Sequence, residues 1–232
     1  MHCNQSTAAL SALYSWHDVW SADFPRACGP GCAACCTPNV SLTSLEARYL
    51  IAAPLFQETV GMGEKIRRRA AGPLYRPTCT INQVAACCLA HQEPPADTSE
   101  HVGGVCLFLD DQSQCRIYAH RPMACRAMAS QVRCRPGSEA VVEPFVLTVN
   151  LALHQIIEHL DQEGVTGSLP EVVVWVTGGG VKRPLPVNQP LPGFLVPSDE
   201  QERFNAFLRE LVELPVGGRR FGDHLPARQL RF

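Results

Sequence analysis

Four cysteines fall within nine residues in the stretch Cys28-Gly29-Pro30-Gly31-Cys32-Ala33-Ala34-Cys35-Cys36. Glycine reaches positive φ, proline bends the backbone and alanine adds little bulk, so the sulfurs of such a stretch can converge on one point. Adjacent cysteines point in different directions, so either Cys35 and Cys36 bind different metal ions or only one of them binds. We therefore predict that this segment is the centre of a metal site.

The composition favours metal binding over disulfide formation. The chain has 12 cysteines among 232 residues, and its start lacks the basic stretch and apolar run of a secretion signal. In a reducing cytosol, thiols usually bind metal or do redox chemistry, so we expect a cytoplasmic metalloprotein. The alternative is a secreted, disulfide-linked protein whose leader has been removed.

The charge balance and hydropathy argue against two classes of partner. Lys+Arg number 20 against 22 Asp+Glu, which gives a formal net charge of -2. Such a chain has no strong positive field for nucleic acid or anionic lipid. No apolar stretch is long enough to span a bilayer. We therefore expect neither a nucleic-acid partner nor a membrane.

A second set of cysteines follows at nearly even intervals: Cys106, Cys115, Cys125 and Cys134. Four thiolates complete the first shell of a zinc ion or an iron-sulfur cluster. Arg116, Arg121 and Arg126 lie within this set and are suited to offset the negative charge of the thiolates. We predict that Tyr118, Arg121 and Arg126 surround the metal ligands without binding metal themselves.

The two sets of cysteines and the residues between them together resemble the motif of a known family. The CxxxCxxCC opening, Cys106, the run Cys115-x-x-Tyr118-x-x-Arg121-Pro122-x-x-Cys125-Arg126 and Cys134 resemble the YkgJ-type cysteine-cluster family, whose members are described as zinc- or iron-chelating proteins. The family has eight characteristic cysteines, and the resemblance implies eight metal ligands here: Cys28, Cys32, Cys35, Cys36, Cys106, Cys115, Cys125 and Cys134. It covers about residues 28 to 134. Some relatives, the flagellin lysine methylases, join such a cluster to methyl transfer.

Hydrophobic spacing and capping signals predict the regular elements. Helices are expected over 7–20, about 44–53, about 144–163 and from about 198 to 214. A capping-box signature at Thr80 predicts one more helix, which would place Cys87 and His91 on one face with Cys88 alongside. Cys79, Cys87, Cys88 and His91 are therefore either extra ligands or packing residues. Residues 171–177 resemble a strand, and the prolines of 184–197 predict an extended segment.

These elements predict a mainly α or irregular α+β fold, loop-rich, with a metal-stapled cysteine-cluster core and packing helices. Residues 1–140 would form the cysteine-cluster metal-binding region. Residues 141–232 would form a helical and strand extension packed on it, so that the chain makes one compact unit.

Four functions fit the thiolate set. An iron-sulfur protein with a redox or cofactor-dependent role is favoured, because eight thiolates would complete two cubanes, or one cubane and a structural zinc. The alternatives are a structural zinc-binding interaction module with a protein or peptide partner, a cluster-dependent methyltransferase or peptide-modifying enzyme, and a metal carrier or store.

Whether the chain is an enzyme stays open. The spacing of Cys28, Cys32 and Cys35 is also that of radical S-adenosylmethionine proteins, but the alternating strand-helix pattern of their barrel is absent, and Ala34 replaces the usual aromatic. Neither a general base nor a nucleophile stands out.

Overall fold

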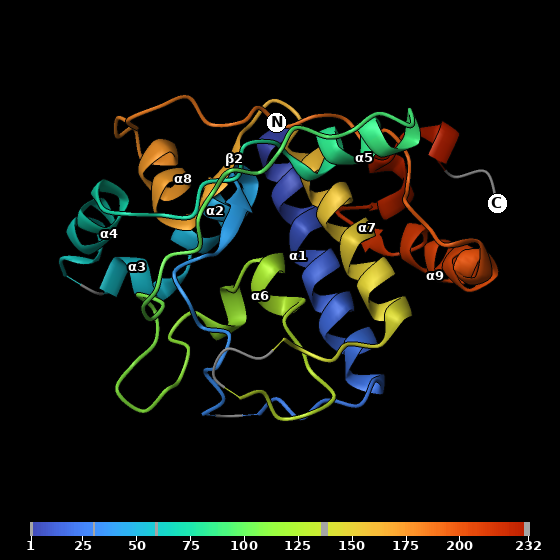
Figure 1. The fold of residues 1–232 in the computed structure, drawn as a ribbon. Helices are drawn as coiled ribbons and strands as arrows, with labels where there is room; N and C mark the ends of the chain where they lie inside the picture. Colours follow the sequence, from blue (N-terminus) through green and yellow to red (C-terminus); the bar gives the residue numbers. More distant parts are fainter. Residues whose placement is uncertain (1, 30, 59, 136–138, 230–232) are drawn as a thin grey trace.

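The computed structural model describes residues 2–29, 31–58, 60–135 and 139–229. This described part is mainly helical, with nine α-helices and two small two-stranded sheets (Figure 1). The predicted fold class, mainly α or α+β, is confirmed. The helices are α1 (His2–Trp20), α2 (Ser44–Ile51), α3 (Pro54–Glu58), α4 (Met62–Ala71), α5 (Ile81–Leu89), α6 (Met123–Arg126), α7 (Pro144–Leu160), α8 (Leu169–Val176) and α9 (Gln201–Val212). The strands are β1 (Ser41–Thr43), β2 (Thr166–Ser168), β3 (Pro215–Val216) and β4 (Arg219–Arg220).

One apolar core lies between α1, α7 and α9, seen in the centre and right of Figure 1. α7 contributes the stripe predicted from its sequence, and Val149, Leu153 and Ile156 have no exposed surface. Leu10 and Leu13 of α1 are equally buried, and Phe207 of α9 packs against Trp16. The long apolar stripes of these helices therefore form a core to which none of the eight predicted ligands contributes.

A second core joins α2, α4 and α8. Its main element corrects the sequence analysis, because the expected strand over 171–177 is the helix α8. Pro170 occupies the first turn of α8, where its fixed φ and missing N–H suit a helix. Val172, Val173 and Val174 are all buried, so burial on several sides outweighs the strand propensity of valine.

The two cores are connected by β1 and β2, which pair antiparallel with Leu42 opposite Gly167. The capping boxes predicted at Thr43 and Thr80 are both present, at the starts of α2 and α5. The segment 184–197 is extended, as predicted, and Val187 bridges to Val165. In the described residues no helix is long and apolar enough to cross a membrane.

The carboxylate of Glu46 ties three elements together. It is 3 % exposed and accepts hydrogen bonds from the Tyr14 hydroxyl of α1 at 2.7 Å and from the backbone N–H of Met123 at 2.8 Å. It also closes the capping box at Thr43. Glu46 therefore places the start of α6, and with it Cys125, against the helical core.

His17 makes the stability of the helical core depend on pH. The ring is 2 % exposed, and burial lowers its pKa from 6.5 to about 4, opposed by a hydrogen bond with Asn150. The unfolded chain takes up a proton below about pH 6.5, whereas the folded protein does so only near pH 4, so stability falls as the pH drops through this window. Between pH 7 and pH 5 we expect His17 to account for about 2 kcal/mol of the loss.

Urea unfolding of the wild type and of His17→Gln at both pH values measures this contribution. The variant should lose less stability on acidification. An equal loss in both proteins would show that His17 is not the responsible group.

Candidate metal centre

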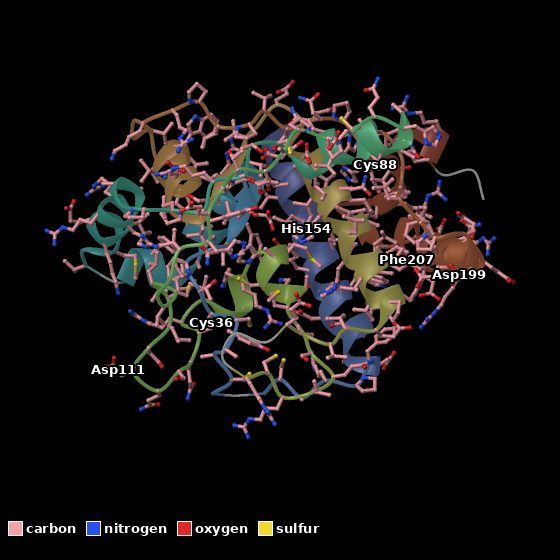
Figure 2. All side chains as sticks on the ribbon, in the orientation of Figure 1. Cys36, Cys88, Asp111, His154, Asp199 and Phe207 are labelled. Carbon is pink, nitrogen blue, oxygen red and sulfur yellow. The ribbon has the colours of Figure 1, made fainter. Side chains whose placement is uncertain are left out.

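The eight predicted ligands lie on α6, which carries Cys125, and in the loops that follow α1, precede α6 and follow α6 (Figure 1). Figure 2 shows Cys36 among these loops, whereas Cys88 lies away from them on α5. Three parts of the chain supply the thiols: residues 28–36, residues 106–115, and the segment from α6 to Cys134.

The opening segment is a series of tight turns, as its glycines and alanines predict. Gly31 has a φ of 79°, in the left-handed region that glycine enters without strain. The amide of Cys32 donates to Gly29 O, and the amide of Cys36 donates to Ala33 O, each at 3.0 Å. Pro30 lies outside the described residues. These turns fold the four thiols of the segment back on one another.

Backbone hydrogen bonds bring the later cysteines to this segment. The amide of Cys106 donates to Cys36 O at 2.8 Å, and Leu109 forms a bridge with Cys115. Beyond α6, the amide of Ala27 donates to Ser130 O at 2.7 Å, and the amide of Ser130 donates to Cys28 Sγ at 3.4 Å. The fold therefore places Cys106 next to Cys36, and the backbone of Ser130 next to Cys28.

One group of neighbouring thiols consists of Cys28, Cys32, Cys35 and Cys134. The pKa of Cys28 is raised by burial, opposed by the Ser130 amide, and raised further by the thiols of the other three. This group mixes three cysteines of the opening segment with one that follows α6. We refer to it as the outer group, since Cys32 is exposed.

The second group consists of Cys36, Cys106, Cys115 and Cys125, and we refer to it as the inner group. Burial raises the pKa of Cys125 to about 12, with smaller contributions from Cys106, Cys115 and Cys35. Cys106 and Cys115 also raise the pKa of Cys36. The sequence places Cys36 with the opening segment and Cys134 with the later set, whereas in the fold Cys36 has Cys106 and Cys115 as neighbours, and Cys28 has Cys134.

Cys35 and Cys36 join the two groups. Their thiols are hydrogen-bonded, which lowers the pKa of Cys35 and raises that of Cys36, so the Cys36 S–H donates to the Cys35 sulfur. Because the two residues are adjacent in the chain, any metals held by the two groups would be close neighbours.

A family model described as "Putative zinc- or iron-chelating domain", and named CxxCxxCC, matches residues 27–143. The chain belongs to this CxxCxxCC family. The matched region contains all eight thiols of the two groups, although three residues rather than two separate Cys28 from Cys32. No curated protein and no solved structure matches the chain. Membership supports metal binding, with zinc or iron as the metal.

The thiols of the CxxCxxCC region lie near one another, but they are not arranged around a common metal position. Among the residues that the structure describes, no three Cys, His, Asp or Glu side chains already sit at positions that could hold one metal ion. The donor set nevertheless fits the metals of the family, because four thiolates suit both zinc and iron-sulfur clusters.

Arg121 acts on three thiols of the CxxCxxCC region. It lowers the pKa of Cys35, Cys115 and Cys125, in each case as a smaller cause beside burial or hydrogen bonding. Its guanidinium lies 3.9 Å from the centre of the Tyr118 ring, and its Nε is buried without a hydrogen-bond partner among the described residues. The Nε of Arg121 therefore has an N–H group to donate to a thiolate or sulfide.

Arg126 contacts the backbone of residues 119–121 rather than the thiols. Its guanidinium is buried over the Tyr14 ring, forms an ion pair with Asp18, and donates to the backbone oxygens of Ala119 and Arg121, each at 2.9 Å. Arg116, the third predicted cation, is exposed. Asp18, which pairs with Arg126, and Ser130, which contacts Cys28, were not predicted from the sequence. No local motif marks them, because the role of each depends on a distant loop.

Arg126→Met is expected to destabilise the protein by about 3 kcal/mol, since two buried carbonyls and Asp18 lose a charged donor. Urea unfolding of the metal-loaded protein measures this. The matched control is Arg68→Met, whose arginine is 80 % exposed and pairs with Glu64, and which should cost less than about 1 kcal/mol. Similar losses in both variants would contradict a bracing role for Arg126.

The remaining thiol candidates lie apart from both groups. Cys79, Cys87 and Cys88 belong to α5 or the turn before it. The expected pairing of Cys87 and His91 on one helix face is wrong, because α5 ends at Leu89 and His91 adopts a left-handed φ of 54°. These residues therefore do not extend the metal centre described above.

Proposed function

We propose that this protein binds two metal centres, each held by four cysteine thiolates, and that the centres are iron-sulfur clusters with a redox or cofactor-dependent role. The proposal is supported by the neighbours of three thiols: Cys28 has Cys32, Cys35 and Cys134 near it, whereas Cys36 and Cys125 each have Cys106 and Cys115 near them. Four cysteines are the complete protein ligand set of one cubane. Cys28, Cys32, Cys35 and Cys134 would hold one centre, and Cys36, Cys106, Cys115 and Cys125 the other.

Two features support iron-sulfur chemistry over isolated metal sites. The groups are adjacent through Cys35 and Cys36, which suits electron exchange between two centres. The buried, unpartnered Nε of Arg121 offers a hydrogen bond to sulfur, a contact that tunes the reduction potential of such clusters. When bound, the clusters would supply electron transfer, while the residues of this chain position and screen them.

Anaerobic purification with absorption spectroscopy and parallel iron, zinc, copper and sulfide quantification tests this proposal. Two cubanes predict a brown protein with a broad band near roughly 400 nm and about eight iron and eight sulfide per chain. Absence of labile sulfide would overturn the iron-sulfur assignment. Variable copper or zinc content with rapid exchange would instead identify a metal carrier.

A second candidate is a zinc-stabilised interaction module. Large apolar side chains next to the proposed ligands are exposed, with Val105 at 67 %, Tyr118 at 61 % and Val132 at 52 %. Exposed apolar residues gathered in one region are typical of surfaces that bind a protein partner. This candidate predicts a colourless protein with two zinc ions per chain, which the same metal and sulfide analysis would show.

A further inference from the structure

A cleft of about 580 Å³ opens beside α5. Its volume is that of a site for a small organic molecule. The residues that line it include Cys79, Cys87, Asn82 and Arg228, together with three prolines. None of these residues is among the eight proposed metal ligands.

Asn82 fixes one wall of the cleft. Its side-chain nitrogen donates to the backbone oxygens of Gln155 and Gln189, both at 3.0 Å, and this pairing fixes the orientation of the amide. The side chain is fully buried, and Oδ1 has no hydrogen-bond partner among the described residues. Because Oδ1 has almost no exposed surface, a ligand in the cleft does not reach it, and Asn82 instead holds Gln189 in the wall of the cleft.

Arg228 and two cysteines indicate the chemistry of a ligand for this cleft. Arg228 is exposed at the rim, where one N–H group donates to Leu191 O at 3.3 Å and the charge can attract a carboxylate. Cys79 and Cys87 are partly exposed free thiols. Cys88 is adjacent in sequence and exposed, but it does not line the cleft, so it provides an internal comparison.

We propose that the cleft binds a small disulfide that carries a carboxylate, and that Cys79 or Cys87 forms a mixed disulfide with it. The cysteine thiolate attacks one ligand sulfur, the ligand S–S bond breaks, and a protein–ligand S–S bond forms. The other half of the ligand leaves as a thiolate, which takes up the proton that the cysteine lost. The ligand disulfide is the oxidant, so no further reactant is required.

Glutathione disulfide is a suitable probe, because it joins a disulfide to carboxylates. We expect peptide mapping by mass spectrometry to show faster modification of Cys79 or Cys87 than of Cys88 in the full chain. Arg228→Gln should slow that modification about threefold, the size of one exposed ion pair, and leave Cys88 unchanged. Arg228 is exposed, so this variant should keep the fold.

Two controls separate binding from general thiol reactivity. Cystamine has neither carboxylate nor amide and should modify the cleft thiols at a rate that Arg228→Gln does not alter. Arg219→Gln removes an exposed arginine that does not line the cleft and should behave as wild type. Equal rates at Cys79, Cys87 and Cys88, or an Arg228→Gln protein as reactive as the wild type, would overturn the proposal. Neither result depends on the metal content of the cysteine groups.

Discussion

The double variant Cys36→Ser with Cys125→Ser is expected to lose one metal centre and keep the other, so that its metal content falls by about half. Both residues belong to the inner group, where Cys106 and Cys115 are neighbours of each. A four-thiolate site that keeps only two of its cysteines binds metal weakly, whereas the outer group keeps its four ligands. Metal analysis of the purified protein gives the result directly.

The complementary variant Cys125→Ser with Cys134→Ser is expected to damage both centres, because it removes one ligand from each group. Cys88→Ser is the matched control, since Cys88 is exposed on α5 and outside both groups. Grouping by position in the chain predicts the reverse, with both centres affected in the first variant and one in the second. That reversed pattern would disprove the grouping proposed from the fold.

Removal of the metal under reducing conditions is expected to unfold the cysteine-bearing loops while the helical core survives. Between residues 102 and 122 the structure describes no α-helix, only the short 3-10 helix Tyr118–His120 and isolated pairings such as that of Leu109 with Cys115. Structural zinc sites contribute on the order of 10 kcal/mol to folding. The buried stripes of α1, α7 and α9 form their core without any cysteine of the two groups.

Hydrogen exchange followed by mass spectrometry distinguishes the two regions. Chelation should strongly increase exchange in the described residues of 24–40 and 102–135, while the amides in the middle of α7 stay protected. Thermal unfolding should begin more than about 10 °C lower in the metal-free protein. Unchanged exchange in the loops after complete metal removal would contradict a metal-stapled core, and loss of protection in α7 would show that both regions unfold together.

Several features of the fold were predictable from local sequence. The stripe of α7 and the capping boxes at Thr43 and Thr80 depend on residues only three or four positions apart, and all are present. The prediction of a strand over 171–177 was wrong, because a short apolar run is compatible with a strand or a helix. Only packing against α2 and α4 decides between the two.

The sequence by itself determined that eight thiols of the CxxCxxCC type are present and that turns of glycine and alanine bring the first four together. Only the tertiary structure decides which thiols from distant parts of the chain lie near one another. The bond from the Cys106 amide to Cys36 O and the bond from the Ser130 amide to Cys28 Sγ connect segments about seventy to a hundred residues apart. No local pattern encodes such contacts, because they depend on how α6 and its flanking loops pack against the helical core.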